Sequence, residues 1–296
     1  MSTRSTTKFL AICVTLALAA SMAATQAQAQ LTFTTVDVPG AMETDINDIN
    51  TAGTLVGTYC TGDICPATGT GTPQAFMKLN GKLKKITVPN STGSYAYGIN
   101  DAGDVVGWYV DQSGITHGYL LKSGKFTKID PPGSTLTNAW GINTAGVIVG
   151  TYIGTDGVYH GFVDNAGTYT TFDAPNGSLL TQLTGVNNKN QMVGIYFDPS
   201  SVQHGFTLAG TKFTSFDFPG ASVTAGDKIS DLGEIVGLHG TSSSGPFSGY
   251  TKKGPTYADV AAPNSTETRV RGLNNAGVIT GRYTDSSGKI HGFTAQ

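Results

Sequence analysis

The amino-acid sequence predicts an all-β fold: a six-bladed β-propeller of four-stranded antiparallel blades, with the ring closed by the N-terminal strand. Three observations predict it. One sequence unit recurs every 43 or 44 residues, each unit divides into four strand-like segments, and the two chain ends hold complementary parts of one unit. Gly makes up 40 of 296 residues and charged residues only 13%, a composition that favours short strands and tight turns over disorder.

Three phrases repeat with this period. The phrase G-I-N-x-A-G-x-x-V-G-x-Y is centred on Asn100, Asn143, Asn187 and Asn274, with weaker copies at Asn50 and Ser230. A second phrase, His-Gly-Phe or a close variant, ends at Phe76, Tyr119, Phe162, Phe206, Tyr250 and Phe293. A third places prolines at Pro39, Pro89, Pro132, Pro175, Pro219 and Pro263. The first repeat is longer than the others because of an insertion around residues 60–71.

Each unit is expected to form four strands. In the second unit these are Ser94–Ile99, Asp104–Tyr109, Thr116–Leu121 and Lys125–Asp130. Asn, Asp, Ser and Gly occupy the segments 100–103, 111–114 and 123–124 between them, where hairpin turns require such residues. No helical period of apolar residues runs through the chain after its first 29 residues, so helix should be scarce.

The chain ends predict how the ring closes. The last unit stops after its third strand, at His291-Gly292-Phe293, while the segment from Phe33 to Pro39 aligns with the fourth strands of other units. Pairing this N-terminal strand into the last blade would complete the ring. An open solenoid would instead leave an incomplete blade with a bare edge.

Residues 1–29 are predicted to be a signal peptide, followed by the propeller over residues 30–296. Arg4 and Lys8 supply a basic start, an apolar run follows from Phe9 to Ala20, and Ala27-Gln28-Ala29 forms a small-x-small cleavage pattern. A buried first helix is the alternative interpretation. No later stretch is apolar for about 18 residues, so we expect no membrane span in the mature chain and a secreted or periplasmic location.

Charge and cysteine content limit the partners. Removal of Arg4 and Lys8 leaves 16 basic and 20 acidic residues, a formal net charge of −4, which makes nucleic acid an unexpected partner. Cys60 and Cys65 form an even pair, and export favours a disulfide between them over a metal or redox site. We expect a monomer with no cofactor and no bound metal, and the sequence offers no catalytic motif such as H-E-x-x-H or G-x-S-x-G.

The repeated phrases resemble those of the bacterial extracellular HAF-repeat proteins. The resemblance rests on GINxAGxxVGxY followed by HGF and covers essentially residues 31–296. The family tripeptide is His-Ala-Phe, whereas this chain has His-Gly-Phe or His-Gly-Tyr, and Gln-Ala-Phe in its first unit. The resemblance implies an exported repeat protein and transfers no catalytic residue.

Residues that recur in every unit are expected to hold the blades together. The histidines His117, His160, His204 and His291 lie on predicted third strands that radial blades carry apart, so packing or a local hydrogen bond is favoured over a shared metal. The asparagines that open the A-G turns are expected to cap those turns. The aspartates Asp37, Asp130, Asp173 and Asp217, which precede the inter-unit prolines, are also interpreted as structural.

A binding site is expected where the units differ. Thr or Ser is constant six residues before each turn residue, whereas the positions three and five before it vary. These variable positions are Asp45 and Asn47, Tyr95 and Tyr97, Asn138 and Trp140, Gln182 and Thr184, Ala225 and Asp227, and Arg269 and Arg271. We predict a ligand site with Tyr95, Tyr97 and Trp140 on one side and Asp45, Asp227, Arg269 and Arg271 on the other. An ion pair between Asp227 and Arg271, in a channel filled only by solvent, is the simpler alternative.

The function predicted first is an exported, non-catalytic repeat protein that binds a ligand or partner through one propeller face. Aromatic faces and arginines suit a polar small molecule or a saccharide, an acidic one in particular. Two alternatives stay open. One is a secreted polysaccharide lyase or glycosidase, which would use carboxylates such as Asp45 and Asp227. The other is a structural cell-surface or matrix protein in which the repeat itself is the function.

Overall fold

The computed structural model describes residues 31–61, 71–175 and 177–296, and every regular element in these ranges is a β-strand. The all-β prediction is therefore confirmed for the described residues. The predicted signal peptide, Cys65 and most of the insertion lie outside them.

The strands fall into four sets by their order within each repeat. The innermost are β2 (Glu43–Ile49), β6 (Ser91–Ile99), β10 (Leu136–Ile142), β14 (Leu180–Val186), β18 (Val223–Ile229) and β22 (Ser265–Leu273). The second are β3 (Leu55–Thr61), β7 (Val105–Asp111), β11 (Ile148–Ile153), β15 (Gln191–Phe197), β19 (Ile235–Gly240) and β23 (Ile279–Asp285). The third are β4 (Thr72–Leu79), β8 (Thr116–Lys122), β12 (Tyr159–Asn165), β16 (Gln203–Ala209), β20 (Ser248–Lys253) and β24 (Ile290–Ala295). The outermost are β5 (Lys82–Lys85), β9 (Lys125–Ile129), β13 (Thr168–Phe172), β17 (Lys212–Phe216), β21 (Thr256–Val260) and β1 (Phe33–Thr35).

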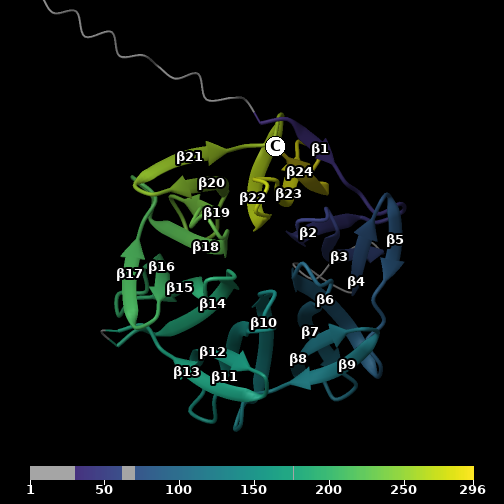
Figure 1. Ribbon diagram of the computed structural model, residues 1–296. Helices are drawn as coiled ribbons and strands as arrows, with labels where there is room; N and C mark the ends of the chain where they lie inside the picture. Colours follow the sequence, from purple (N-terminus) through teal and green to yellow (C-terminus); the bar gives the residue numbers. More distant parts are fainter. Residues whose placement is uncertain (1–30, 62–70, 176) are drawn as a thin grey trace, which may run out of the picture. The chain divides into compact units, whose positions relative to one another are not determined.

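Consecutive strands pair antiparallel in the order β6-β7-β8-β9, and the same order recurs in the other repeats (Figure 1). In the last group, β22, β23 and β24 are followed outward by β1, which pairs antiparallel with β24. The predicted strand bounds of the second unit agree with the structure to within two residues, except that β6 begins three residues earlier, at Ser91. The extension has a bulge between Ser91 and Gly93, which a count of strand residues does not reveal.

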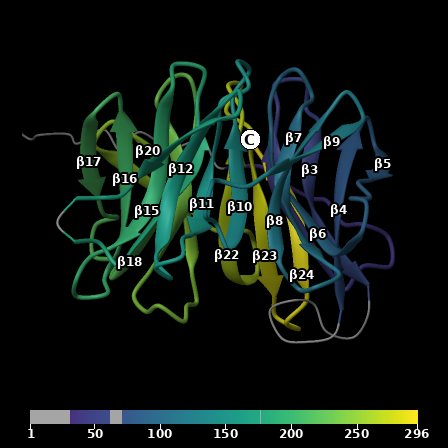
Figure 2. The same ribbon diagram turned by 90° about the horizontal axis from the view of Figure 1, so that it is seen from below.

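The innermost strands contact one another in sequence, and β22 contacts β2. In Figure 1 these strands face a common centre, with the outermost strands on the periphery. Seen from the side, the strands run between two faces that carry the loops (Figure 2). Single parallel pairs also link neighbouring groups, as between Tyr159 and Leu180.

The repeated apolar residues form the packing between groups. The last residue of the His-Gly-Phe phrase is fully buried in each copy: Phe76, Tyr119, Phe162, Phe206, Tyr250 and Phe293. The Gly of V-G-x-Y is needed for close approach of strands. A Cβ on Gly107 would collide with the carbonyl oxygen of Tyr95, and the equivalent clash recurs at Gly57, Gly150, Gly194, Gly237 and Gly281.

The repeated asparagines cap the turns, as predicted, and also link one repeat to the next. Asn100 Oδ1 accepts the N–H of Asp104 at 2.9 Å, and its Nδ2 donates to the carbonyl oxygen of Asn143 at 3.0 Å. The same donation to the next repeat runs from Asn50, Asn143 and Asn187, and Asn274 donates to Asn50 O at 3.2 Å. Ser230 replaces Asn in the fifth repeat, and there Asp231 N–H donates to Asn275 Oδ1, a bond that Thr51, Thr144 and Asn188 also make to the next repeat.

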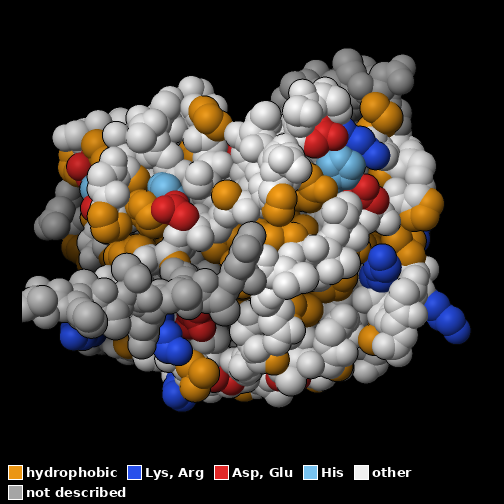
Figure 3. All heavy atoms as spheres, turned by 90° about the horizontal axis from the view of Figure 1, so that it is seen from above, with side chains coloured by type: hydrophobic (Ala, Val, Ile, Leu, Met, Phe, Trp, Pro, Cys, Tyr) orange, Lys and Arg blue, Asp and Glu red, His pale blue; other side chains and the backbone are white. Residues whose placement is uncertain are grey.

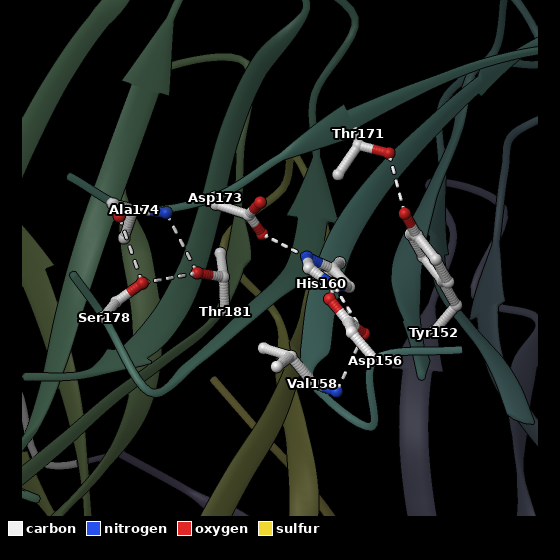
Figure 4. Close-up of polar contacts among 9 residues, drawn as sticks. All are labelled: Tyr152, Asp156, Val158, His160, Thr171, Asp173, Ala174, Ser178 and Thr181. Atoms are coloured by element: carbon white, nitrogen blue, oxygen red, sulfur yellow. Dashed lines mark hydrogen bonds and ion pairs between the residues drawn. The ribbon is translucent and has the colours of Figure 1, made fainter. Parts of the chain in front are cut away.

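The repeated histidines make the local hydrogen bonds that the sequence predicted. His160 Nδ1 lies 2.8 Å from Asp173, and its Nε2 lies 3.1 Å from Asp156 (Figure 4). His117, His204 and His291 pair in the same way with Asp130, Asp217 and Asp37. On the face shown in Figure 3, histidines lie beside carboxylates.

The constant Thr of the innermost strands completes this frame. Thr181 Oγ1 accepts the N–H of Ala174, just before an inter-unit proline, at 2.9 Å (Figure 4). Thr44, Thr224 and Thr268 do the same for Val38, Phe218 and Ala262. At the N-terminal strand, Val36 and Val38 are buried, whereas Phe33 is only half-buried and packs on Phe293.

Candidate functional site

The variable positions of the innermost strands surround two adjoining cavities. The first cavity has a volume of about 200 Å³. Every residue three positions before a turn residue lines it: Asn47, Tyr97, Trp140, Thr184, Asp227 and Arg271. Gln182, Ala225 and Arg269, five positions before the turn, also line it.

The second cavity has a volume of about 150 Å³ and shares Asn47, Tyr97 and Arg271 with the first. Its remaining polar wall contains Glu43, Asp45, Tyr95 and Arg282, among others. The predicted site residues are therefore divided between two cavities and do not form two facing walls of one. Asn138 lines neither cavity.

Aromatic rings form a continuous wall along both cavities. Tyr95 stacks on Trp108 with ring centroids 3.6 Å apart, and Tyr97 packs edge-on against Trp140 at 4.4 Å. Tyr95 and Tyr97 stack less closely, at 6.3 Å. Because these rings pack on one another, each is held in a fixed orientation at the cavity surface.

Arginines line the same cavities and pair with carboxylates. Arg271 lies 3.5 Å from Asp227, which joins two neighbouring innermost strands. Arg282 on β23 lies 2.8 Å from Glu43 and 3.7 Å from Asp45. Arg269 pairs with Glu267, and its guanidinium lies 4.7 Å from the centre of the Phe247 ring.

Burial shifts the pKa values of the site. It raises the pKa of Asp227, although Arg271 opposes the shift. It raises the pKa of Tyr97 to about 12, so the phenol is a neutral hydrogen-bonding group. Burial also raises the pKa of Glu43 against the opposing charge of Arg282.

Several buried polar atoms at the cavities have no hydrogen-bond partner among the described residues. They are Asp45 Oδ1, Asn47 Oδ1, Asp227 Oδ2 and Arg271 Nε. A buried polar atom without a partner costs roughly 1–3 kcal/mol. These atoms therefore favour a polar molecule that supplies the missing hydrogen bonds.

A buried ion pair lies between the first cavity and the turn face. Lys228 Nζ lies 3.1 Å from Asp48 and donates to the carbonyl oxygens of Tyr97 and Trp140 at 3.2 and 3.0 Å. Both charged residues occupy the position two before the turn residue, where the other four repeats have Gly98, Gly141, Gly185 and Gly272. Asp48 also accepts the N–H groups of Ile49 and Ile99. The pair separates the first cavity from the turn face, and the hydrogen bonds of Lys228 fix the backbone of Tyr97 and Trp140.

Sequence reasoning missed Trp108, Arg282, Glu43, Lys228 and Asp48. Trp108 and Arg282 are the x residues of V-G-x-Y, and they lie directly across from Tyr95 and Arg269 in the strand register. Cross-strand neighbours point to the same face of a sheet, so variation at x was a usable signal. For Lys228 and Asp48, the signal was the loss of Gly in two units. The identity of their partners was not visible.

Two further features are absent from the described residues. In this part of the chain, no group of three His, Cys, Asp or Glu side chains is placed to hold a metal ion. It also contains no helix long and apolar enough to cross a lipid bilayer.

Comparison with known proteins identifies the fold. No family model matches the chain, and no curated protein matches it. TolB from Acinetobacter baumannii is similar in structure, with a TM-score of 0.58 and 12% identity over 81% of this chain and 63% of TolB. The β-propeller domain of the Trilobed protease from Pyrococcus furiosus gives 0.52 and 10% over 86% of this chain and 94% of that one. The six-bladed fucose-recognising lectin from Aleuria aurantia gives 0.50 and 11% over 88% and 93%. The chain thus has a β-propeller fold.

Proposed function

We propose that this β-propeller is an exported binding protein whose two central cavities bind an acidic saccharide. The observation that carries the proposal is the combination of packed aromatic rings, arginines and unpartnered polar atoms around the same two cavities. Aromatic faces stack on the apolar face of a sugar ring, and a guanidinium binds a carboxylate through two hydrogen bonds.

The scaffold of the proposal is a closed ring of six blades. Support comes from the pairing of β1 with β24, from the contact of β22 with β2, and from the hydrogen bond of Asn274 to Asn50. Closure holds the innermost strands at fixed positions, which a preorganised cavity requires. The Aleuria aurantia lectin, described as a six-bladed propeller that recognises fucose, is a precedent for sugar binding on this fold.

Export and the HAF-repeat relationship belong to the same proposal. They are supported by the sequence of residues 1–29 and by the repeated phrases. Cleavage after Ala29 predicts a mature chain that begins at Gln30, measurable by mass spectrometry of the exported protein. We also propose a disulfide between Cys60, which is buried on β3, and Cys65. Alkylation before and after reduction tests it, and two free thiols in the native protein would contradict it.

An enzyme acting on a polysaccharide is the second candidate. The raised pKa of Asp227 in a cavity is a property that general acids share. The ion pair of Asp227 with Arg271 favours binding, because the charge of Arg271 opposes the rise in the Asp227 pKa that a general acid requires. Assay of acidic polysaccharides for new reducing ends or unsaturated products distinguishes the two.

The proposal is tested by titration calorimetry of the mature protein against uronic acids, neutral sugars and their oligomers. We expect saturable binding of acidic saccharides that requires Arg271 and Trp140. Absence of binding to every acidic saccharide would contradict the proposal.

A further inference from the structure

We infer that the site binds two successive sugar rings, an acidic ring in the first cavity and a neutral ring in the second. This inference rests on the proposed function and goes further, since it fixes the length of the recognised unit and the order of its rings. Three properties of the cavities carry it: their contact with each other, their charge and their aromatic surfaces.

The two cavities adjoin through shared residues. Asn47, Tyr97 and Arg271 line both, so no complete strand separates them. Two of the unpartnered atoms, Asn47 Oδ1 and Arg271 Nε, belong to these shared residues. One acceptor and one donor at the junction suit the linkage between two rings and the hydroxyl groups beside it.

The cavities differ in charge. Lys228, Arg269 and Arg271 line the first cavity with Asp227, whereas Asp48 and Glu267, the acids paired with Lys228 and Arg269, do not line it. The second cavity has two arginines, Arg271 and Arg282, and two acids, Glu43 and Asp45. Each cation of the first cavity has an acid partner, but only one of these acids, Asp227, lies at the cavity wall. The wall of the first cavity therefore favours a carboxylate, whereas the second cavity, where acids and arginines both line the wall, favours a neutral ring.

Each cavity also has an aromatic surface of its own. Trp140 lines the first cavity, and Tyr95, supported by Trp108, lines the second. Tyr97 lies at the junction and contacts Trp140. A sugar ring can stack in each cavity, which a site for a single ring would not require.

The experiment compares two monosaccharides and a set of disaccharides on four proteins by calorimetry. The ligands are glucuronic acid, glucose, and a set of disaccharides that join glucuronic acid to glucose through each linkage. The proteins are the mature wild type, Tyr95→Ala, Tyr95→Phe and Arg269→Gln. Tyr95 lines only the second cavity and Arg269 only the first, and Tyr95→Phe keeps the stacking ring as a matched control.

We expect the wild type to bind one disaccharide at least tenfold more tightly than glucuronic acid. Tyr95→Ala should lower affinity for that disaccharide by about tenfold and leave affinity for glucuronic acid unchanged, while Tyr95→Phe stays close to wild type. Arg269→Gln should weaken both acidic ligands by a similar factor.

Two results would overturn the inference while the proposed function stands: disaccharides that bind no better than glucuronic acid, or an equal loss of both ligands in Tyr95→Ala. An equal affinity of Arg269→Gln and wild type for glucuronic acid would overturn the assigned ring order. If no acidic saccharide binds at all, the proposed function fails and the two-ring site with it.

Discussion

Trp140 and Asn143 lie three residues apart in the sequence, near the end of the same strand and in the turn that follows it, and they represent two regions of the molecule. Asn143 belongs to the repeated frame: its Oδ1 accepts the N–H of Val147, and its Nδ2 donates to Asn187 and Asn190. Trp140 belongs to the variable channel positions. Its ring contacts Tyr97 and lines a cavity. Asn143 links neighbouring repeats, whereas Trp140 provides a cavity surface.

The difference lies in where polar groups find their partners. In the frame, each repeated His and Asn bonds to its own repeat or to the next, as His160 does with Asp156 and Asp173. At the channel, Asp227, Arg271, Asp45 and Asn47 each keep a buried atom without a partner in the described chain. Unpartnered buried atoms also occur in the repeated frame, at Asp37, Asp130 and Thr137, so the distinguishing feature of the channel is that such atoms gather around two adjoining cavities, where a ligand can reach them. Repetition therefore indicates structure, and variation within a constant frame indicates recognition.

The largest effect is expected from removal of the N-terminal strand. Deletion of residues 31–39 from the mature chain removes the pairing of β1 with β24, the Asp37 partner of His291 and the buried Val36 and Val38. Each buried side chain contributes roughly 1.5–3 kcal/mol, against a total stability of about 5–15 kcal/mol. We expect aggregation or a clearly lower midpoint of denaturant unfolding.

Deletion of Gln30 alone is the control for that experiment. An unchanged unfolding midpoint after deletion of 31–39 would contradict closure.

A smaller effect is expected at Lys228 and Asp48, which replace the Gly of the other four repeats. Lys228→Met leaves Asp48 buried without its cation, and we expect a loss of roughly 3 kcal/mol in unfolding free energy. The double variant Lys228→Gly/Asp48→Gly restores the residue of the other four repeats and should lose less than Lys228→Met. Chemical denaturation of both measures the difference. If the double variant is less stable than Lys228→Met, the stability loss in Lys228→Met does not come from the unpaired charge of Asp48.

The variants Asn143→Ala and Trp140→Ala test whether frame residues and cavity residues have separate roles. Asn143→Ala removes three hydrogen bonds of the frame and should cost roughly 1–3 kcal/mol of stability with ligand affinity unchanged. Trp140→Ala should weaken binding of an acidic saccharide by about tenfold or more. Denaturation and calorimetry on both variants should show the loss of stability in Asn143→Ala and the loss of affinity in Trp140→Ala. Equal effects of both substitutions on affinity would contradict the division into frame and site.

The smallest effect is expected at His160 and depends on pH. Burial lowers the pKa of His160, but the hydrogen bonds and charges of Asp173 and Asp156 outweigh it and raise the pKa overall. Its contribution to stability is therefore fully present below the unfolded-state pKa of about 6.5 and is lost as pH rises through the higher folded-state value. The stability difference between wild type and His160→Gln should be larger at pH 5.5 than at pH 9. A stability difference that does not change with pH would show that the charge of His160 does not contribute to stability.

The fold could be predicted because its signals repeat. The period, the turn residues and the offset of the chain ends fixed the strand order, and the structure places Phe33–Thr35 beside Ile290–Ala295. Strand bounds were less certain, as at Ser91, because a bulge adds residues without changing the pattern. Phe33 is only half-buried, since a ring on an outermost strand is covered from one side only.

The site could be predicted in part. Position relative to the turn identified Tyr97, Trp140, Asp227 and Arg271, because equivalent residues on equivalent strands must meet at the centre of a ring. The division into two cavities was not predictable, because it depends on side-chain contacts such as the pairing of Arg282 with Glu43 across two strands. These partners are set by three-dimensional packing, which spacing along the sequence does not reveal.

The central claim is that the variable channel positions form the ligand site, and tryptophan fluorescence tests it most directly. The chain contains two tryptophans; Trp140 lines the first cavity, and Trp108 stacks on Tyr95 of the second. We predict that titration with the best-binding acidic disaccharide changes the emission saturably, and that Trp108→Phe and Trp140→Phe each keep part of the change. An emission spectrum that stays constant in the wild type, while calorimetry on the same samples reports binding, would contradict the claim, because the ligand would then bind elsewhere.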